Sequence, residues 1–565
     1  GEHVYRVPRL SVPDVDSRLT QEAMAASSAV QLFAQRAQAV HHDFALDSAT
    51  VAPVVEICRR LDGLPLAIEL AAARLRHFTA PELLRRLTAN DSGSDGKPAG
   101  LAVLTSDTRN VPERHRSLWD TIAWSFELLD ADEQVLFRRL ALFVAGWTVE
   151  AAQAVCGDGL ALEVEPALWS LADKQLIQRA DDAGDMLRFT MLETLREFGI
   201  DTLRRTGEYV RTQMRMAEYC AAFAERANLH LHGAREVSVP WYRAMAVEYP
   251  NLRASLTWVL TERHVELSVR LCAALIDFWR SNLRDGEQVT AATLAMAVNA
   301  RPSAPLVNVY LAAGQCARLM GKPDGVETYM PRALELAEML DSEELDRSQI
   351  GLAYGLLAWT AFDRGDYAQA QAHHIRLDRL NRRPGNEFEL AMYLVNAGRM
   401  ELRLGHFQRA TELIDEALLL HRQVGEVWGL LKTLADLAEL HATTGQLELA
   451  GAVLAESELL LQQVHMPDQV ARIRQAGALY ALRCEDAGLA AQRLAAALDG
   501  HEQTGSQSGI REDILYTAEL AVLAGKPEAA LCLLGAHGAV MQRIGYVYHP
   551  VHRRLVDTIA GTARG

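Results

Sequence analysis

The second half of the chain repeats one short turn sequence five times: Gly365-Asp366-Tyr367, Gly405-His406-Phe407, Gly445-Gln446-Leu447, Glu485-Asp486-Ala487 and Gly525-Lys526-Pro527. Each turn begins 40 residues after the one before it, and an alanine follows five residues after each turn begins. The segments before the turns carry apolar residues at three- and four-residue steps, which is the periodicity of a helix. A glycine or a short polar residue lets the chain reverse between antiparallel helices, and the alanine lets those helices approach closely. The spacing therefore predicts a stack of helical hairpins.

An earlier turn, Gly321-Lys322-Pro323, begins 44 residues before the first of these five. The repeats resemble the tetratricopeptide class, whose usual period is about 34 residues, so the helices here are expected to be longer. Such arrays curve into a concave surface that binds a partner or a ligand. The charged residues of the repeats follow the pattern of solvated helix faces, and no carboxylate pair stands out among them.

The composition is that of a helix-rich globular protein. The chain has 565 residues and a net charge of -16, with 49% hydrophobic, 23% charged and 6% aromatic residues. This balance excludes a disordered chain, and the acidic charge argues against a protein that coats nucleic acid. No stretch approaches 18 uninterrupted apolar residues, so no membrane span is expected. The seven cysteines are scattered and form no Cys-x-x-Cys pair, which is typical of reduced, buried thiols in a cytoplasmic protein.

The part of the chain upstream of the repeats predicts two smaller domains. Residues 28–88 read as several helices, and a polar, glycine-rich loop follows at 91–100. Further on, helices are followed by two strands, 175–179 and 186–190, around an acidic turn at 181–185. Helices followed by such a hairpin make a winged-helix domain. The expected helices cover 29–40, 52–60, 117–128, 131–140, 149–155 and 166–174, and one more begins near Leu64.

The segment Leu61-Asp62-Gly63-Leu64-Pro65-Leu66-Ala67 is the most distinctive motif upstream of the repeats. Gly63 permits a tight turn, and Pro65 is tolerated in the first turn of a helix because its missing N–H would be unpaired there. The pattern alone predicts a corner between two helices. Together with its flanks, residues 55–71 closely resemble the GLPLA region of NB-ARC-type STAND ATPases, which are signal-transducing NTPase switches, and especially the bacterial AfsR-like and LuxR-type regulators.

The resemblance continues in the same order along nearly the whole chain. The segments that carry it are 1–8, which resembles the piece after the last strand of the nucleotide-binding core, 112–118 with 122–129, 136–143, 189–198 and 248–254. It implies a mainly α fold: a helical domain and a winged-helix domain, followed by an α-solenoid of tetratricopeptide-like helical hairpins. The implied boundaries are 1–20 for the tail of the nucleotide-binding core, 21–110 for the helical domain, 111–205 for the winged helix, 206–300 for a helical arm and 301–565 for the repeat sensor domain.

The resemblance also implies a nucleotide-facing role for two short motifs. In these switches the proline of GLPLA lines the nucleotide pocket, so Pro65 inherits that role, with Gly63 and Leu64 shaping the turn. Many relatives carry a Met-His-Asp triplet in the winged helix whose histidine contacts a phosphate. The matching positions here are Met191-Leu192-Glu193. Because leucine cannot donate a hydrogen bond to phosphate, Met191 and Leu192 are expected to be packing residues.

A P-loop is absent from the sequence. It would need Gly-x-x-x-x-Gly-Lys followed by Ser or Thr, and each of the three Gly-Lys pairs here, at 96–97, 321–322 and 525–526, is followed by Pro. We therefore expect no enzymatic activity, no catalytic residue and no bound cofactor in this chain, while ADP or ATP with magnesium is implied for a full-length parent. The missing Met and the start within a motif favour a truncated chain whose NTPase core lies upstream in cis.

The histidine pairs and the winged helix are the remaining candidates for a metal site or a DNA-binding site. The pairs His41-His42, His230 with His232, and His373-His374 are expected to be ordinary histidines without metal, because neighbouring histidines on a helix point in different directions. The candidate DNA-reading helix at 166–174 offers a single lysine, Lys174, beside an acidic wing. Direct DNA binding is therefore not expected, and a charge swap at Lys174 is expected to be neutral.

The leading hypothesis is a signal-sensing and relay portion of a STAND-type transcriptional regulator. In it, a small molecule or a protein binds the repeat array and biases a nucleotide-dependent switch, and the family resemblance suggests activation through self-assembly. The alternative is a stand-alone tetratricopeptide scaffold for protein partners. A sequence-specific DNA-binding protein is the third reading and has the least support.

Overall fold

The computed structural model of the chain describes residues 10–13, 27–41, 44–47, 49–88, 118–180, 187–231, 235–340, 347–382, 385–464 and 466–564. The chain forms two compact units, residues 1–219 and residues 220–565. Most of the expected 1–20 tail, the loop at 91–100, the acidic turn at 181–185 and His42-Asp43 lie outside the described residues. Each unit is described by itself.

The first unit begins with a small helical bundle. Helix α2 (Ser28–Val40) packs against α4 (Pro65–Ala73), and α3 (Val51–Arg60) packs against α5 (Ala80–Thr88). Phe33, Ile57, Ile68 and Leu83 have no exposed surface and form the bundle's core. Each of the four helices contributes one of these side chains, and their burial in a common core holds the short helices together.

A winged helix follows in the same unit. Its elements are α7 (Leu118–Glu127), α8 (Ala131–Leu140), β1 (Trp147–Thr148), α9 (Val149–Cys156), α10 (Val164–Asp173), β2 (Gln178–Arg179), β3 (Arg188–Thr190) and α11 (Glu193–Arg205). Strand β3 pairs antiparallel with β2, which confirms the predicted hairpin. It also pairs with β1, which was not predicted because two residues carry no readable alternation. The rings of Phe137, Trp147 and Phe189 are completely buried in this domain: Phe137 packs against Phe198 of α11, and Phe189 of β3 against Trp169 of α10.

The second unit starts with an arm of helices. These are α12 (Tyr209–Leu231), which runs through the boundary between the units, α13 (Arg235–Thr261), α14 (Val265–Ala274), the short helix η3 (Phe278–Ser281) and α15 (Leu283–Met296). Trp279 on η3 is completely buried, and its indole N–H donates to the carbonyl of Cys272 over 3.1 Å. The arm leads directly into the repeats.

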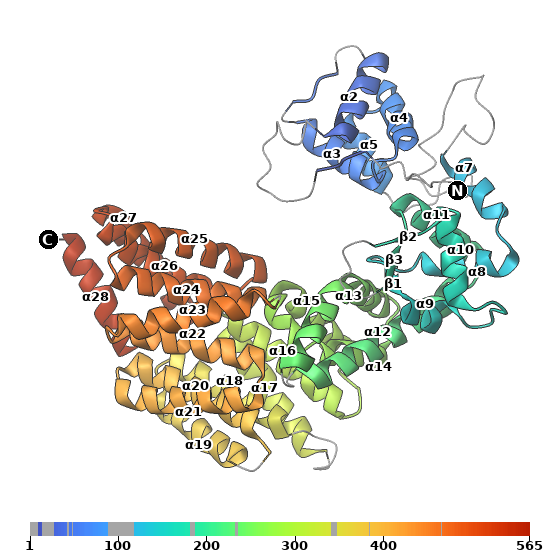
Figure 1. Ribbon diagram of the computed structural model, residues 1–565. Coiled ribbons are helices and arrows are strands. Elements are labelled where there is room, and N and C mark those ends of the chain that lie inside the picture. Colours follow the sequence, from blue (N-terminus) through green and yellow to red (C-terminus); the bar gives the residue numbers. More distant parts are fainter. Residues whose placement is uncertain are drawn as a thin grey trace. The chain divides into compact units, whose positions relative to one another are not determined.

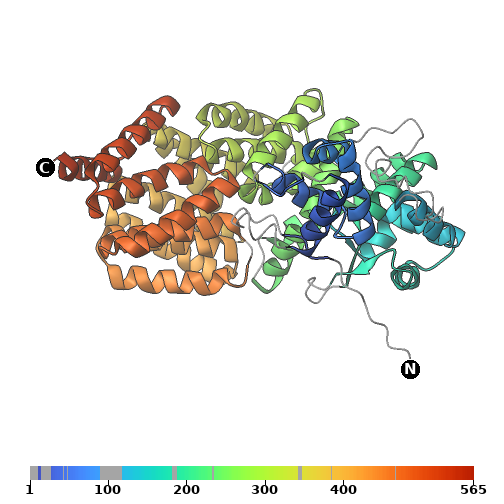
Figure 2. The ribbon, with the colours of Figure 1, turned by 90° about the horizontal axis from the view of Figure 1, so that it is seen from above.

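In the described residues, the repeats comprise six antiparallel helix pairs and a final helix, and Figure 1 and Figure 2 show how these helices stack. The pairs are α16 (Ala304–Leu319) with α17 (Pro323–Glu338), α18 (Arg347–Asp363) with α19 (Tyr367–Asn381), α20 (Glu387–Leu404) with α21 (Phe407–Val424), α22 (Val427–Thr443) with α23 (Leu447–Leu461), α24 (Pro467–Arg483) with α25 (Ala487–Thr504), and α26 (Gln507–Leu523) with α27 (Pro527–Ile544); the final helix is α28 (Pro550–Arg564). The first helix of each pair contacts the first helix of the next pair, so these first helices form one continuous inner layer. The mainly α fold with a solenoid of helical hairpins is confirmed.

The turns between the paired helices have the backbone conformation that the sequence predicts. Gly365, Gly405 and Gly445 adopt φ of 83°, 87° and 78°, values that favour glycine. Glu485, which stands where the other turns have glycine, adopts φ of 58°. The alanines that follow the five turns are at most 3% exposed, which places them at the closest approach of each helix pair.

The array contacts itself across long sequence separations. Helix α16 touches α26, and α28 packs against both α20 and α26. Near the C-terminus, the N–H of Val547 donates to the carbonyl oxygen of Asp363 over 2.8 Å, and the His549 ring stacks on Phe362 at 4.0 Å. Further back, the Ser281 hydroxyl donates to Asp468 over 2.9 Å. The first and last repeats therefore enclose a shared interior.

Two properties expected of the whole chain can be compared with this structure. Five cysteines are buried, but Cys484 and Cys532 are exposed, so the expectation of buried thiols is wrong for these two. Among the described helices, none combines the length and apolar character that a membrane crossing needs.

Candidate functional site

The helix corner at Gly63 is tightly built. Gly63 adopts φ of 63°, and a Cβ there would lie 2.4 Å from the carbonyl oxygen of Leu10. The N–H of Leu10 donates to the carbonyl of Gly63 over 3.2 Å, which ties the preceding segment to the corner. Leu64 is the N-cap of α4, and Pro65 is its exposed first residue. The predicted corner is confirmed, while the nucleotide-facing role of Gly63, Leu64 and Pro65 stays a prediction.

The second predicted motif lies against this corner. The N–H of Thr194 donates to the Asp62 carboxylate over 3.4 Å, and Arg60 lies 3.6 Å from the carboxylate of Glu197. The structure therefore brings together two motifs that are about 130 residues apart, since Asp62 and Thr194 differ by 132 positions. Met191 and Leu192 are half-buried, and Leu192 is the N-cap of α11 without a side-chain hydrogen bond.

Two glutamates at this contact have pKa values that are shifted in opposite directions. Burial alone would raise the pKa of Glu193, but the hydrogen bonds from Arg196, over 2.6 and 2.7 Å, outweigh burial and lower it. Burial raises the pKa of Glu197 to about 7, and the charge of Glu193 adds to the effect. The carboxyl group of Glu197 is therefore expected to titrate near neutral pH.

Replacing Glu197 with glutamine should stabilise the first unit at pH 8 and leave it unchanged at pH 5. The folded pKa of about 7 lies above the ordinary value of 4.5, so wild-type stability falls as pH rises through this window. Because the side chain is partly exposed, we expect a gain of about 1 kcal/mol at pH 8. Thermal unfolding at the two pH values measures it. Glu165→Gln, at an exposed position on α10, is the control, and equal stability of wild type and Glu197→Gln at pH 8 would contradict the prediction.

The winged helix presents an acidic face. An open depression beside α9 and α10 is lined by four carboxylates and one ammonium group, those of Glu150, Glu163, Glu165, Asp173 and Lys174. Phosphate groups are attracted by clustered cations. The charge of this face is therefore the opposite of what a phosphate-binding surface needs.

Lys174 is a structural residue. Its ammonium donates to both carboxylate oxygens of Glu133, over 2.6 and 2.5 Å, and Ser170 donates to the same carboxylate over 2.6 Å. Glu133 is only 5% exposed. The expectation that a charge swap at Lys174 is neutral for DNA binding stays a prediction. Stability is a separate matter, because the swap would place a second carboxylate beside the buried carboxylate of Glu133.

We expect Lys174→Glu to lower the unfolding free energy of the first unit by about 1–3 kcal/mol, because the buried carboxylate of Glu133 loses its cationic donor and gains a like charge beside it. Urea denaturation followed by circular dichroism measures the change. Lys174→Arg keeps a cationic donor and is the matched control, so a loss of the same size in both variants would show that packing rather than charge is responsible.

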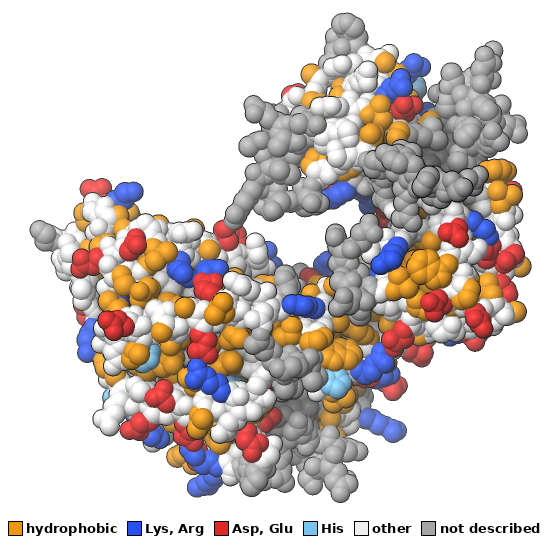
Figure 3. All heavy atoms as spheres, in the orientation of Figure 1, with side chains coloured by type: hydrophobic (Ala, Val, Ile, Leu, Met, Phe, Trp, Pro, Cys, Tyr) orange, Lys and Arg blue, Asp and Glu red, His pale blue; other side chains and the backbone are white. Residues whose placement is uncertain are grey.

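The second unit encloses a cavity of about 630 Å³ between its inner helices. This volume lies in the range of small-molecule binding sites. Among the described residues, the lining includes seven basic side chains, Arg280, Arg318, Arg399, Arg403, Lys432, Arg472 and Arg511, and five acidic ones, Asp277, Asp363, Glu389, Asp468 and Glu512. On the outer face seen in Figure 3, acidic and basic side chains are interspersed. Charged side chains therefore line the interior as well as the outer surface.

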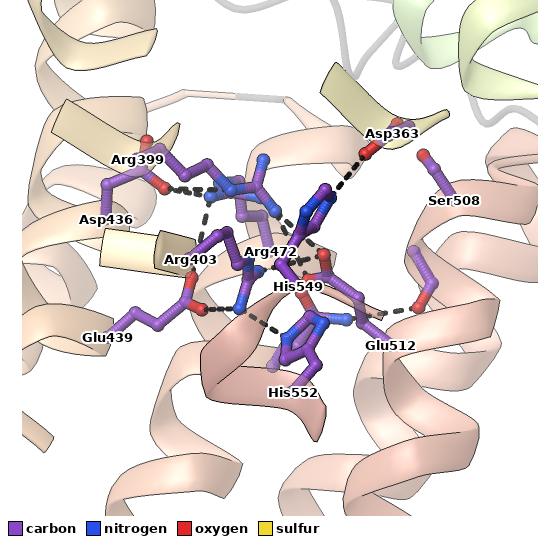
Figure 4. A network of polar contacts seen from close by, with 12 residues as sticks. Asp363, Arg399, Arg403, Asp436, Glu439, Arg472, Ser508, Glu512, His549 and His552 are labelled. Atoms are coloured by element: carbon purple, nitrogen blue, oxygen red, sulfur yellow. Dashed lines mark hydrogen bonds and ion pairs between the residues drawn. The ribbon is translucent and has the colours of Figure 1, made fainter. Parts of the chain in front are cut away.

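Asp436 is the centre of one buried charge cluster (Figure 4). Its carboxylate has no exposed surface and pairs with Arg472, with Lys432 over 3.4 Å and with Arg399 over 3.8 Å. These partners lie on α20, α22 and α24, so one carboxylate links three successive repeats. Burial alone would raise the pKa of Asp436, but the three cations hold it near 2.

Arg403 extends the network toward the C-terminal helix. It lies 2.6 Å from Glu439 and 2.9 Å from Glu512, and its guanidinium donates to His552 Nε2 over 2.6 Å. Arg399 also reaches Glu512, over 3.1 Å. Figure 4 shows these side chains converging from several helices on one space.

The network holds more positive than negative charge. Four cations, Arg399, Arg403, Lys432 and Arg472, face three carboxylates, those of Asp436, Glu439 and Glu512. The Nε atoms of Arg399 and Arg472 are buried and make no hydrogen bond within the described residues. Burial, opposed by Asp436, lowers the pKa of Lys432 to about 8. Buried cations without full compensation cost stability.

A second buried ion pair lies where the C-terminal segment crosses the repeats. Asp363 is 2.9 Å from Arg318 and 3.4 Å from His549. The charge of Arg318, together with the hydrogen bond to His549, holds the pKa of Asp363 near 2 although burial opposes this. The Trp359 ring lies between the networks, 5.4 Å from the guanidinium of Arg318 and 5.6 Å from that of Arg399. Aromatic and charged groups therefore share the cavity wall.

Sequence reasoning missed this site because it treated the charges as solvated faces. Asp436 and Glu439 are in fact 0% and 6% exposed. A signal was present: both acids interrupt the apolar run of α22, a helix whose Leu434, Leu437 and Leu440 mark a buried face. A charged residue within the apolar stripe of a helix indicates a buried charge, whereas a charged residue beside the stripe is usually exposed.

The histidines have structural surroundings. His374 Nε2 lies 2.8 Å from the sulfur of Met400, and burial lowers its pKa to about 4. His230 stacks on Trp241 at 5.2 Å. In the described part of the chain, no group of three or more His, Cys, Asp or Glu is arranged to hold a metal ion.

Comparison with known proteins gives a family profile and curated relatives. The profile described as "Winged helix-turn-helix domain" matches residues 129–204, which include α8 to α11. The protein named "Putative HTH-type transcriptional regulator Rv0890c" of Mycobacterium tuberculosis is 36% identical over 290 residues, covering 51% of this chain and 30% of that protein. "Uncharacterized protein Rv0894" of the same organism is 34% identical over 211 residues, covering 37% of this chain and 48% of that protein. The chain thus spans less than half the length of either relative.

Two solved structures show weaker likeness. A STAND protein with a tetratricopeptide repeat sensor from Pyrococcus horikoshii has a TM-score of 0.37 at 12% identity, covering 95% of this chain and 74% of that one. A Rap protein complexed with Competence and Sporulation Factor has a TM-score of 0.40 at 11% identity, covering 75% of this chain and 99% of that one. At these scores neither likeness bears on function.

Proposed function

We propose that this chain is the signal-sensing and relay portion of a STAND-type transcriptional regulator. In this proposal a ligand binds inside the repeat unit, and the contact between the Gly63 corner and α11 passes the signal to a nucleotide-dependent core encoded upstream. The observation that carries the proposal is the cavity of about 630 Å³ whose wall contains a buried, unbalanced charge network. The similarity to proteins named as transcriptional regulators supports the regulatory context.

The network is costly for a purely structural element. Apolar residues of similar volume usually stabilise a core as well as buried ion pairs do, and often better. The inner layer already contains apolar packing, as Leu431 and Leu434 on α22 show. Charges kept beside a cavity at the expense of stability are typical of binding sites.

The described residues do not form a nucleotide site by themselves. The N–H groups of Asp62, Gly63 and Leu64 already donate to carbonyls of the corner, over 2.9, 3.1 and 2.9 Å, and Pro65 has no N–H. Leu192, at the position of the family's histidine, offers no side-chain donor to a phosphate. Any ADP or ATP would therefore need phosphate and magnesium ligands from another segment, and this corner could supply only an edge of the pocket.

Two measurements test the proposal. The coding sequence upstream of Gly1 should encode a strand, a Gly-x-x-x-x-Gly-Lys-Ser/Thr loop and acidic metal ligands, and their absence would refute the nucleotide switch. For sensing, a library of small metabolites should be screened on the full chain by thermal shift. A ligand that binds should slow hydrogen exchange in α20, α22 and α24 and change exchange at 60–65 and 191–197. Protection of the repeats alone would refute the relay.

A protein-binding scaffold is the second candidate, and one observation favours it. The outer helices of successive pairs expose leucines: Leu419 is 58% exposed, Leu449 52%, Leu459 62% and Leu498 41%. Exposed apolar side chains on one layer are typical of protein interfaces. If this reading holds, Leu449→Ser with Leu459→Ser should abolish capture of a specific partner by the full chain and leave ligand-induced thermal shifts unchanged.

A further inference from the structure

We propose that the ligand of the repeat cavity is a small organic anion, whose carboxylate or phosphate group lies against Arg399, Lys432 and Arg472 and whose apolar body lies against the aromatic wall. This inference rests on the proposed function only in taking the cavity to be the ligand site. It adds the chemical class of the ligand and the residues that select it.

The charge count of the central network supports an anion. Asp436, Glu439 and Glu512 leave one of the network's four cations, whose side chains are 5–18% exposed, without a matching carboxylate. One anionic group would balance the network, and the gain would exceed that of a surface ion pair because these side chains are largely buried. A neutral ligand would leave the excess charge in place, and a cationic ligand would increase it.

The partly exposed ends of the cations give the anion its partners. The side chains of Arg399 and Arg472 are 18% exposed although their Nε atoms are buried, so an anion would contact the outer nitrogens of these guanidinium groups. Both arginines and Lys432 contribute to the cavity lining. Hydrogen bonds from such cations to carboxylate or phosphate are short and stronger than neutral ones. Both anionic groups share this chemistry, so the experiment must separate them.

The rest of the wall fits an apolar body. Trp359, Tyr393 and Trp428 line the cavity together with leucines of the inner helices. Trp428 is held in place, because its indole N–H donates to Asp468 over 3.1 Å and Arg280 lies 4.1 Å from its ring centre. Fixed aromatic rings offer flat apolar contacts at little entropic cost. A volume of about 630 Å³ admits a small molecule of this kind.

The first experiment compares matched probes on the full chain by thermal shift and calorimetry at constant ionic strength. Benzoate and phenyl phosphate carry the two anionic groups on the same ring, and benzamide is the neutral control. We expect a saturable stabilisation by at least one anion and none by benzamide, and the stronger anion identifies the headgroup. Inorganic phosphate tests the headgroup without the body and should bind more weakly than phenyl phosphate. Benzamide binding as tightly as the anions, or no saturable anion binding, overturns the proposal.

The second experiment removes one cation. In Lys432→Met, Asp436 keeps Arg399 and Arg472, so the unliganded protein should be at least as stable as wild type. Affinity for the better anion should fall roughly tenfold. Lys322→Met, at an exposed lysine paired with Glu287, is the control and should bind as wild type does. A variant that loses stability but keeps its affinity would mean that Lys432 is structural and would overturn the proposal.

A pH series on the wild-type chain keeps the test valid even if the variant does not fold. Anion affinity should fall between pH 7 and pH 9, since the pKa of Lys432 is lowered to about 8. The groups facing Lys432 are Asp436 on its own helix, Arg399 on α20, Arg472 on α24 and His421 on α21. Phenyl phosphate, with a second pKa of about 6, does not titrate there. An affinity that is flat in this range contradicts the role of Lys432.

The outcomes separate this inference from the proposed function. If the metabolite library yields only neutral ligands that protect α20, α22 and α24 from exchange, the anion inference fails and ligand sensing stands. If no compound of any charge binds the cavity, ligand sensing fails as well.

Discussion

Replacing Asp436 with alanine is expected to lower the unfolding free energy of the repeat unit by about 3–5 kcal/mol, the cost of breaking a buried ion pair from one side. Asp436 is fully buried and is paired with Arg399, Lys432 and Arg472. Without it, these largely buried cations would repel one another with no carboxylate between them. Urea denaturation of the full chain by circular dichroism measures the loss. Asp415→Ala, at an exposed position on the neighbouring α21, is the control and should change little.

The pH dependence provides a second check on Asp436. Burial would raise its pKa, but Arg472, Lys432 and Arg399 lower it to about 2, below the ordinary value of 3.8. A lowered carboxyl pKa contributes stability above the unfolded value, and this stability is lost as pH falls through the folded value. Wild type should therefore lose stability between about pH 4 and pH 2, and Asp436→Ala should lose less over the same range. Parallel curves for the two proteins would contradict the assignment.

Ending the chain at Gly545 should cost the repeat unit on the order of 5 kcal/mol. The truncation removes Ile559, which is 2% exposed in a cluster with Leu515 and Leu534, and the His549 ring that stacks on Phe362. It also removes the N–H of Val547 that donates to Asp363. Since terminal elements shield the apolar end of a repeat array, we expect a lower unfolding temperature and faster proteolysis.

A second truncation separates loss of the crossing segment from loss of chain length. A chain that ends at Gly561 keeps Ile559 and His549 and should unfold close to the wild-type temperature. It should also keep its anion binding, whereas the chain ending at Gly545 should lose it because Tyr546 and His549 line the cavity. Equal unfolding temperatures for all three chains would show that the C-terminal helix contributes nothing to the unit.

The helix pairs could be predicted because each depends on local signals. The turn at Gly405 needs a left-handed residue, and Ala410 needs only a close helix neighbour, so both can be read within a few positions of the chain. The hairpin of β2 and β3 was readable for the same reason. Strand β1 was not, since Trp147-Thr148 is too short to show a period.

The interior network could not be predicted, because its members become neighbours only when the array is complete. Arg403 on α20 meets Glu512, 109 positions later, and His552, 149 positions later. No spacing rule relates such positions, and each charge alone resembles a surface residue. The Gly63 corner shows the same limit: its turn was readable, whereas its contact with Thr194 was not.

The closure of the array changes how this unit should fold. An open solenoid behaves as a one-dimensional chain of repeats that can nucleate anywhere and lose its ends first. Here Tyr367 meets His549 across 182 positions, Ser281 meets Asp468 across 187, and Arg243 meets the carbonyl of Gln463 across 220. Contacts between residues so far apart in the sequence form only after the chain has closed long loops. The entropic cost of closing these loops slows folding. During synthesis the unit therefore stays incomplete until its last helix has left the ribosome, and once closed it resists fraying from either end.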